Sequence, residues 1–207
     1  MDPALPERLA DRLCHDVLSS AQAIASGLDL LTEATSAAER DEATAFLAEA
    51  VAAQRTKVRY ARYAYGPAGA GIQTSELKSL AQALFADIRP TLDWAVELTV
   101  LGPAAARGLL VLLQIAADAL AAGGRATVTA QAEGGLLRVE VDAAGPRAAV
   151  RDEVRGSLSG APFQAGLGGR WVQGAWVAAL VAEASGTVGL ETYDGGLRLV
   201  LSLPPGA

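Results

Sequence analysis

The chain is poor in the side chains that bind metals and form crosslinks. Its 207 residues include one histidine, one cysteine and one methionine, and aromatic residues make up 5% of the total. One cysteine cannot form a disulfide within the chain, and one histidine with one cysteine falls short of the ligand set of a usual zinc site. A metal centre built from a single chain is therefore not expected.

Positive charge is scarce as well. Lysine and arginine number 17 against 23 aspartate and glutamate residues, which gives a formal net charge of −6. Nucleic-acid binding needs a surplus of cations. The chain also lacks an uncharged apolar run of about 18 residues that could cross a bilayer, and it lacks the N-terminal pattern of a signal peptide. We expect a cytoplasmic protein that binds neither nucleic acid nor membrane.

One short run from Gly66 to Gly71 is rich in glycine and proline and cannot continue a helix. We take this run to separate two domains, residues 1–66 and residues 72–207. In the first, apolar residues recur at three- and four-residue steps from Leu9 to Leu31 and predict a long helix. Ser36 and Glu39 form a capping-box pattern that opens a second helix, which reaches about Tyr65.

The connection between these two helices is short, so they are expected to form an antiparallel hairpin. A hairpin of this length leaves apolar surface uncovered. Pairing with a second copy, which would give a four-helix bundle, is the simplest way to bury that surface. The sequence therefore predicts a homodimer.

The single histidine, His15, lies on the first helix and away from its apolar stripe. Imidazole is a good nitrogen nucleophile, so His15 is the first candidate for chemistry. An ordinary surface histidine is the alternative. With a rotation of about 100° per residue, the side chains nearest to His15 are small or polar: Arg8, Asp11, Arg12, Ser19, Gln22 and Ser26.

The second domain alternates strand and helix patterns. Strands are expected near 71–73, 94–100, 126–132, 136–142, 188–193 and 197–203, and helices near 76–86 (capped by Ser75), 103–121 and 172–185. This order predicts an α+β sandwich, a mixed sheet with helices on one face.

Four segments carry a resemblance to a known family: Arg12-Leu13-Cys14-His15-Asp16, Gly27-Leu28-Asp29-Leu30-Leu31, Leu112 to Leu120, and Gly123-Gly124-Arg125. In this order they resemble the dimerisation and ATP-binding halves of a sensor histidine kinase. The chain resembles the ChpT-type histidine phosphotransferases of alphaproteobacteria more closely, over nearly its whole length. The resemblance implies a helical hairpin followed by a degenerate kinase-like ATP-binding domain.

The nucleotide site of such kinases is eroded in this sequence. Ile115 stands where the kinases place an Asn in the central helix, and Gln114 is one position off, about 100° around the helix. Ala143 stands at the adenine-binding position, which Asp142 could fill only with a one-residue slip. Gly166-Leu167-Gly168-Gly169 resembles a phosphate-binding lid, but a lone glycine-rich loop is a weak signal. We expect no cofactor of the chain's own.

A histidine without a phosphoryl donor of its own is typical of a phosphotransferase. The resemblance implies that His15 takes a phosphoryl group from the receiver domain of a hybrid histidine kinase, which supplies the Mg²⁺, and passes it to response regulators of the CtrA kind or single-domain receivers. Asp16 either fixes the tautomer of His15 or is a solvated helix charge, and Ser19 stands at a position where such kinases carry a polar residue. The alternatives are an ATP-dependent sensor kinase and a non-catalytic scaffold that sequesters receivers.

The second helix carries the main basic cluster: Arg55, Lys57, Arg59 and Arg62. With the turn centred near residue 34, Gln54 and Arg55 should lie level with His15. These cations either attract an acidic receiver or complement the helix dipole as a solvated end. The candidate partner-binding residues are Arg8, Arg12, Gln22, Arg55 and Arg59. Cys14 is expected to be a small packing residue.

Overall fold

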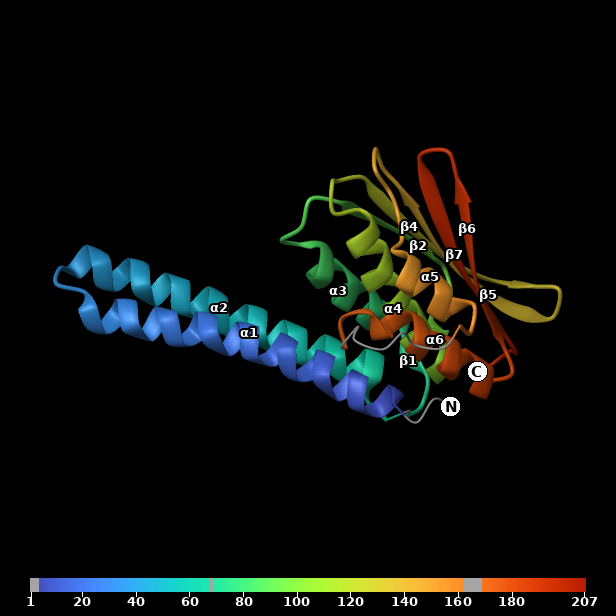
Figure 1. Ribbon diagram of the computed structural model, residues 1–207, viewed down its shortest axis with the longest axis horizontal. Coiled ribbons are helices and arrows are strands. Elements are labelled where there is room, and N and C mark those ends of the chain that lie inside the picture. Colours follow the sequence, from blue (N-terminus) through green and yellow to red (C-terminus); the bar gives the residue numbers. More distant parts are fainter. Residues whose placement is uncertain (1–3, 68, 162–168) are drawn as a thin grey trace.

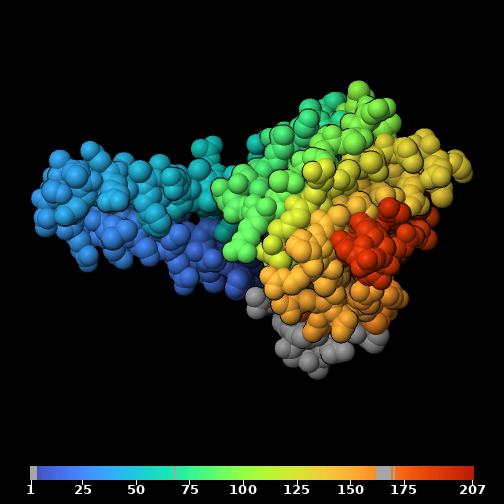
Figure 2. All heavy atoms as spheres, turned by 90° about the horizontal axis from the view of Figure 1, so that it is seen from above, coloured from blue at the N-terminus to red at the C-terminus, as the bar shows by residue number. Residues whose placement is uncertain are grey.

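The computed structural model describes residues 4–67, 69–161 and 169–207. Its N-terminal part is a hairpin of two helices, α1 (Leu5–Glu33) and α2 (Ala37–Tyr65). The Ser36 hydroxyl accepts a hydrogen bond from the Glu39 N–H, and the Glu39 carboxylate returns one to the Ser36 N–H, so the capping box starts α2 as predicted. The hairpin projects from the rest of the molecule (Figures 1 and 2).

A glycine allows the two helices to pack closely. Gly27 is buried against α2, and a Cβ atom there would lie 2.8 Å from the side chain of Leu47. Helix α1 ends at Glu33 and α2 begins at Ala37, so the antiparallel helices place His15, eighteen residues before Glu33, level with Arg55, eighteen residues after Ala37. This agrees with the expectation that Gln54 and Arg55 lie level with His15.

The rest of the chain is a sandwich of helices on one face of a mixed sheet, as predicted (Figure 1). The strand order is β2-β4-β5-β7-β6, with β2 parallel to β4 and the other pairs antiparallel. The strands are β2 (Thr91–Val96), β4 (Arg125–Glu133), β5 (Leu136–Ala144), β6 (Thr187–Tyr193) and β7 (Gly196–Leu203), and the helices are α3 (Thr74–Phe85), α4 (Pro103–Ala119), α5 (Asp152–Leu158) and α6 (Val172–Glu183).

The core lies between α4 and the sheet. Leu109 and Leu112 of α4 are fully buried, and so are Val139, Val141 and Ala143, which alternate along β5 toward the helices. This alternation leaves the residues between them on the opposite face of the sheet. A residue of β5 can therefore contribute to a site beside α4 only if it faces the helices.

Three local expectations were wrong. The strand expected over 94–100 is divided into β2, which ends at Val96, and a separate β3 (Val100–Leu101) that pairs with β1 (Ile72–Gln73). Helix α3 begins at Thr74, with Gln73 as its N-cap in place of Ser75, because the Thr74 hydroxyl is taken up by the Leu98 carbonyl, 2.5 Å away. Helix α5 was not predicted, since seven residues with an internal glycine show too little periodicity.

The hairpin packs on the sandwich at the end where α1 begins and α2 ends. Leu5 and Leu9 of α1 pack with Val172 of α6. From α2, the Tyr60 hydroxyl donates to the Leu110 carbonyl at 2.6 Å, and the Ala64 carbonyl accepts from the indole of Trp176 at 3.3 Å. The Gly- and Pro-rich run joins the two parts between Tyr65 and Ile72; their division into domains at 1–66 and 72–207 stays a prediction. Within the described residues, no helix combines the length and apolarity that crossing a membrane requires.

Candidate functional site

His15 lies on the outer side of α1, and 80% of its side chain is exposed, as the helical rotation predicts. Its Nδ1 is 3.4 Å from Oδ1 of Asp16. A carboxylate beside Nδ1 favours the tautomer that carries the proton there, which leaves the lone pair on Nε2. Among the described residues Nε2 has no hydrogen-bond partner. The site therefore presents a nucleophilic nitrogen to solvent.

The carboxylate of Asp16 is itself held in place. Nε of Arg12 donates to Oδ2 of Asp16 at 2.9 Å, and the Arg12 side chain is only 18% exposed. One turn further on, the buried Ser20 hydroxyl donates to the Asp16 carbonyl at 3.2 Å. Arg12, Asp16 and His15 thus form one chain of contacts along α1, with Asp16 in the middle.

This chain of contacts ends close to a link between the hairpin and α4. The Tyr65 hydroxyl donates to the side-chain oxygen of Gln114. Burial raises the pKa of Tyr65; the charge of Arg12 opposes this rise and that of Asp16 adds to it. The phenol is therefore protonated at neutral pH and acts as a donor to α4.

The other candidates on α1 have separate environments. Ser19 and Gln22 are exposed, and Arg8 is half-buried. Among the described residues, neither Ser19 nor Gln22 forms a hydrogen bond to His15, whereas Arg12, Asp16 and His15 of the predicted set are joined by close contacts. Cys14 is exposed, so the expectation that it packs inside was wrong; the stripe it borders has no covering helix in one chain.

The predicted basic residues of α2 line a separate cavity of about 1030 Å³. We call it the basic groove, defined by Arg55, Arg59 and Arg62 of α2 and Arg107 of α4. No residue of α1 lines it, so one chain does not bring Arg55 or Arg59 to His15. Their role in partner binding stays a prediction.

The charges of the basic groove are only partly compensated. Arg59 forms an ion pair with Glu76 at 2.6 Å, and the Arg107 guanidinium lies 5.3 Å from the centre of the Trp176 ring. Partial burial lowers the pKa of Arg107. Sequence reasoning missed Arg107, because nothing local connects it to arginines some 45 residues earlier in the chain.

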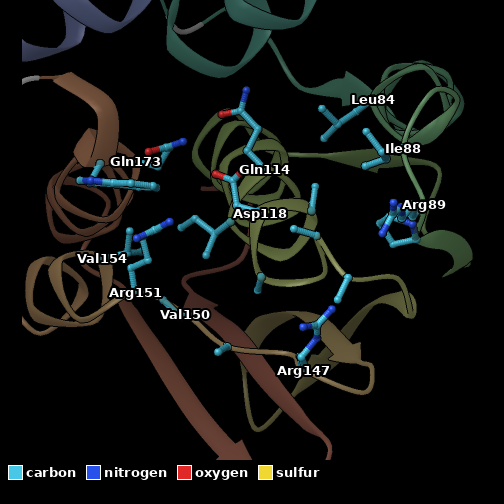
Figure 3. Close-up of a pocket in the computed structure, with 18 of the residues that line it drawn as sticks. Leu84, Ile88, Arg89, Gln114, Asp118, Arg147, Val150, Arg151, Val154 and Gln173 are labelled. Carbon is cyan, nitrogen blue, oxygen red and sulfur yellow. The ribbon is translucent and has the colours of Figure 1, made fainter.

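A cavity of about 970 Å³ lies beside α4 and is lined by Gln114 and Ile115, the residues that the resemblance places at the nucleotide position of the kinases (Figure 3). Gln114 and Asp118 of α4 lie in its middle, with Arg151 on one side and Arg89 on the other. Ile115 also lines it, and the Gln114 amide oxygen is already taken up by Tyr65. The polar group nearest to the missing Asn is thus engaged elsewhere.

Strand β5 brings no carboxylate to this cavity. Ala143 is fully buried toward the helices, whereas Asp142 lies on the other face of the sheet, accepts a hydrogen bond from the Tyr193 hydroxyl at 2.8 Å and lies 3.5 Å from Arg198. A one-residue slip of Asp142 into the adenine position is therefore excluded by its side of the sheet. Residues 166–168 of the lid-like segment lie outside the described residues. Among those described, no cluster of three His, Cys, Asp or Glu side chains could hold a metal ion.

Comparison with known proteins assigns the family. A family model described as the histidine phosphotransferase C-terminal domain matches residues 74–196. The chain belongs to the histidine phosphotransferase family. Protein phosphotransferase ChpT of Brucella abortus (strain 2308) is 31% identical over 123 residues, which are 58% of this chain and 57% of that protein. The match thus spans little more than half of the relative's length.

Solved structures show that the phosphotransferase fold extends over the whole chain. A bacterial phosphotransferase superposes with a TM-score of 0.85 at 24% identity and covers 97% of both chains. Full-length ShkA, solved in complex with AMPPNP, gives a TM-score of 0.52 at 22% identity and covers 96% of this chain and 46% of its own. The histidine kinase AdeS of Acinetobacter baumannii gives 0.50 at 11% identity and covers 93% of this chain and 98% of its own. The chain thus shares its fold with a bacterial phosphotransferase and, with lower TM-scores, with the two other structures.

Proposed function

We propose that this member of the histidine phosphotransferase family is the intermediate of a two-component phosphorelay. His15 accepts a phosphoryl group from the aspartyl phosphate of one receiver domain and returns it to the aspartate of another. The observation that carries the proposal is the exposed His15 with Asp16 at its Nδ1, on a chain whose α4 carries Ile115 at the nucleotide cavity. The described residues present a nucleophile beside a cavity in which Ile115 stands at the position of the kinases' Asn.

The transfer needs little besides this geometry. The lone pair of Nε2 attacks the phosphorus in line, a P–N bond forms, and the P–O bond to the receiver's carboxylate breaks, so the aspartate leaves as a carboxylate. Positive charge develops on the imidazole, and Asp16 stabilises it through the proton on Nδ1. The reverse reaction at a second receiver restores neutral His15. Mg²⁺ at the receiver's acidic pocket would balance the charge of the transferred group.

The proposed partners are receiver domains: that of a hybrid histidine kinase as donor, and response regulators of the CtrA kind and single-domain receivers as acceptors. Such partners imply action in the cytoplasm. The alternative of an ATP-dependent kinase is not favoured by a cavity with Ile115 and a Tyr65-bound Gln114. A transfer assay with His15→Ala distinguishes a phosphotransferase from a scaffold that only sequesters receivers.

The chain is further proposed to act as a homodimer. Val17 and Leu28 of α1 and Val51 and Val58 of α2 are 42–52% exposed. Val51 and Val58 lie about 160 to 180° around α2 from Tyr60, the residue that docks α2 on the sandwich. These four residues, the apolar face of the hairpin, are exposed in one chain, although Val17 and Val58 also border a cavity that Leu84 and Ile88 line, and a second copy can bury them as a four-helix bundle.

The transfer assay tests the proposal directly. A hybrid-kinase receiver carrying labelled phosphoryl is mixed with the wild-type chain, with His15→Ala, and with Ser26→Ala as a control on the same side of α1. We expect acid-labile label on the wild type and on Ser26→Ala, and none on His15→Ala. Equal loss of receiver label with and without His15, and no labelled phosphotransferase, would overturn the proposal in favour of a scaffold. Direct labelling of His15 by γ-labelled ATP would overturn it in favour of a kinase.

A further inference from the structure

In one chain, His15 and the basic groove lie on opposite flanks of the hairpin. His15 lies about 120 to 140° around α1 from Gly27 and Ser20, the buried residues in its middle. Arg55, Arg59 and Arg62 lie about 100 to 160° around α2 from the buried Ala43. Each group therefore faces away from the other helix of its own hairpin.

The two groups nevertheless lie at the same height along the hairpin. The short connection between Glu33 and Ala37 places His15 level with Arg55, and Arg59 and Arg62 lie within about two turns of that level.

A two-fold axis parallel to the helices, in front of the apolar face, would bring the groups together. Rotation about this axis does not change the position of a residue along the helices. It places α2 of the second copy beside α1 of the first. Its outer flank then faces the same side as His15. Because the two helices are antiparallel, Val17 and Leu28 of α1 lie on the same side of the hairpin as Val51 and Val58 of α2. A closed interface between two identical copies requires such a shared apolar side.

We infer that the phosphotransfer site is shared between two copies: His15, Asp16 and Arg12 come from one chain, and Arg55, Arg59 and Arg62 of the basic groove come from the other. The inference rests on the proposed function and adds to it the source of the cations. Within one chain, His15 belongs to α1 and no residue of α1 lines the basic groove.

The chemistry of the partner fits this arrangement. Arg55 and Arg62 have no ion-pair partner among the described residues, although acidic side chains outnumber basic ones in the chain. A receiver presents an acidic pocket, and the group in transfer is an anion. Cations beside His15 speed the encounter with an acidic surface and neutralise the transferring group. The three arginines are positioning residues for the receiver and its phosphoryl group.

Mixed dimers with a single His15 test the inference. In the first dimer, one chain carries His15→Ala, Arg55→Glu and Arg62→Glu together, and the other is wild type. In the second, one chain carries His15→Ala and the other carries Arg55→Glu with Arg62→Glu. The two dimers have identical composition and differ only in which chain holds the arginines. Two affinity tags isolate each mixed dimer, and circular dichroism checks its helix content.

The shared site predicts that the first dimer loses at least tenfold in the rate of label transfer from the receiver, whereas the second keeps the rate of a dimer with one His15→Ala chain. Lys78→Glu on α3, placed in either chain, serves as the control for charge reversal and leaves the rate unchanged. The opposite order, or equal rates in the two dimers, would overturn the inference. So would a wild-type chain that light scattering shows to be a monomer. Failure of the proposed function is a separate result, namely no transfer to wild-type His15.

Discussion

Asp16 connects two side chains that would otherwise be independent. One carboxylate oxygen lies at Nδ1 of His15, and the other accepts from Arg12. A carboxylate in this position fixes the tautomer and offsets charge on the ring, and it does so only if its own orientation is fixed. Arg12 supplies that orientation from within the same helix, one turn away. The reactive geometry is therefore built on a single rigid element.

Replacing this carboxylate by an amide should slow transfer without abolishing it. We expect Asp16→Asn to reduce the rate of His15 phosphorylation on the order of tenfold to a hundredfold, because the charge that develops on the ring loses its partner. Receiver affinity should change little, and Asp16→Glu should restore part of the rate. Single-turnover transfer at several receiver concentrations separates the two quantities, with Asp29→Asn as the control. A variant that loses affinity at an unchanged maximal rate would instead place Asp16 in receiver docking.

At the scale of elements, the features that depend on local sequence were predictable from it. Ser36 and Glu39 act within one turn, so the start of α2 could be placed. The exposure of His15 follows from helical rotation alone. Features set by distant contacts were not predictable: the Leu98 carbonyl moves the start of α3, and Arg107 joins the groove from another helix. The exposed His15 could thus be predicted from local sequence, whereas the full set of residues in the basic groove could not.

The docking of α2 on α4 depends on Tyr60, which is buried at 3% exposure and bonded to the Leu110 carbonyl. Tyr60→Phe should cost about 1 kcal/mol in the free energy of unfolding, the usual value of one such bond. Tyr63→Phe is the control, because its hydroxyl has no hydrogen bond to the described residues. Urea denaturation measures both. Equal effects of the two substitutions would contradict a specific role of the Tyr60 bond.

The same residue predicts a pH dependence. Burial raises the pKa of Tyr60 in the folded chain above its ordinary value of 10.0. The unfolded chain therefore loses this proton first as the pH rises. The stability that the protonated phenol contributes is complete below about pH 10 and is lost as the pH rises toward the folded pKa. Unfolding measured from pH 9 to 11 should show a steeper decline for the wild type than for Tyr60→Phe, and parallel declines would contradict this assignment.

At the scale of the whole molecule, the hairpin projects far beyond the sandwich that anchors it (Figure 1). Among the described residues, the end of the hairpin where α1 begins and α2 ends packs on the sandwich, through Leu5, Leu9, Tyr60 and Ala64. Its apolar face is left to solvent in one chain, and a helical hairpin of this length gains most of its stability from tertiary packing. The proposed second copy, covering the same face, would explain both the projecting shape and the exposed valines.

Charge placed on the apolar face should therefore separate the copies. Val17→Glu combined with Val58→Glu puts four carboxylates into the bundle of a dimer, and burying unpaired charges there costs more than the contacts return. We expect the mass by light scattering to fall to that of one chain, with the sandwich still folded. The matched control is Leu30→Glu, a residue that is 52% exposed and lies away from this face, and it should leave the mass unchanged. Because a monomer would lack the partner's arginines beside His15, label transfer should fall together with the mass. A monomer that transfers at the wild-type rate would separate dimerisation from catalysis and remove the need for a second copy at the site.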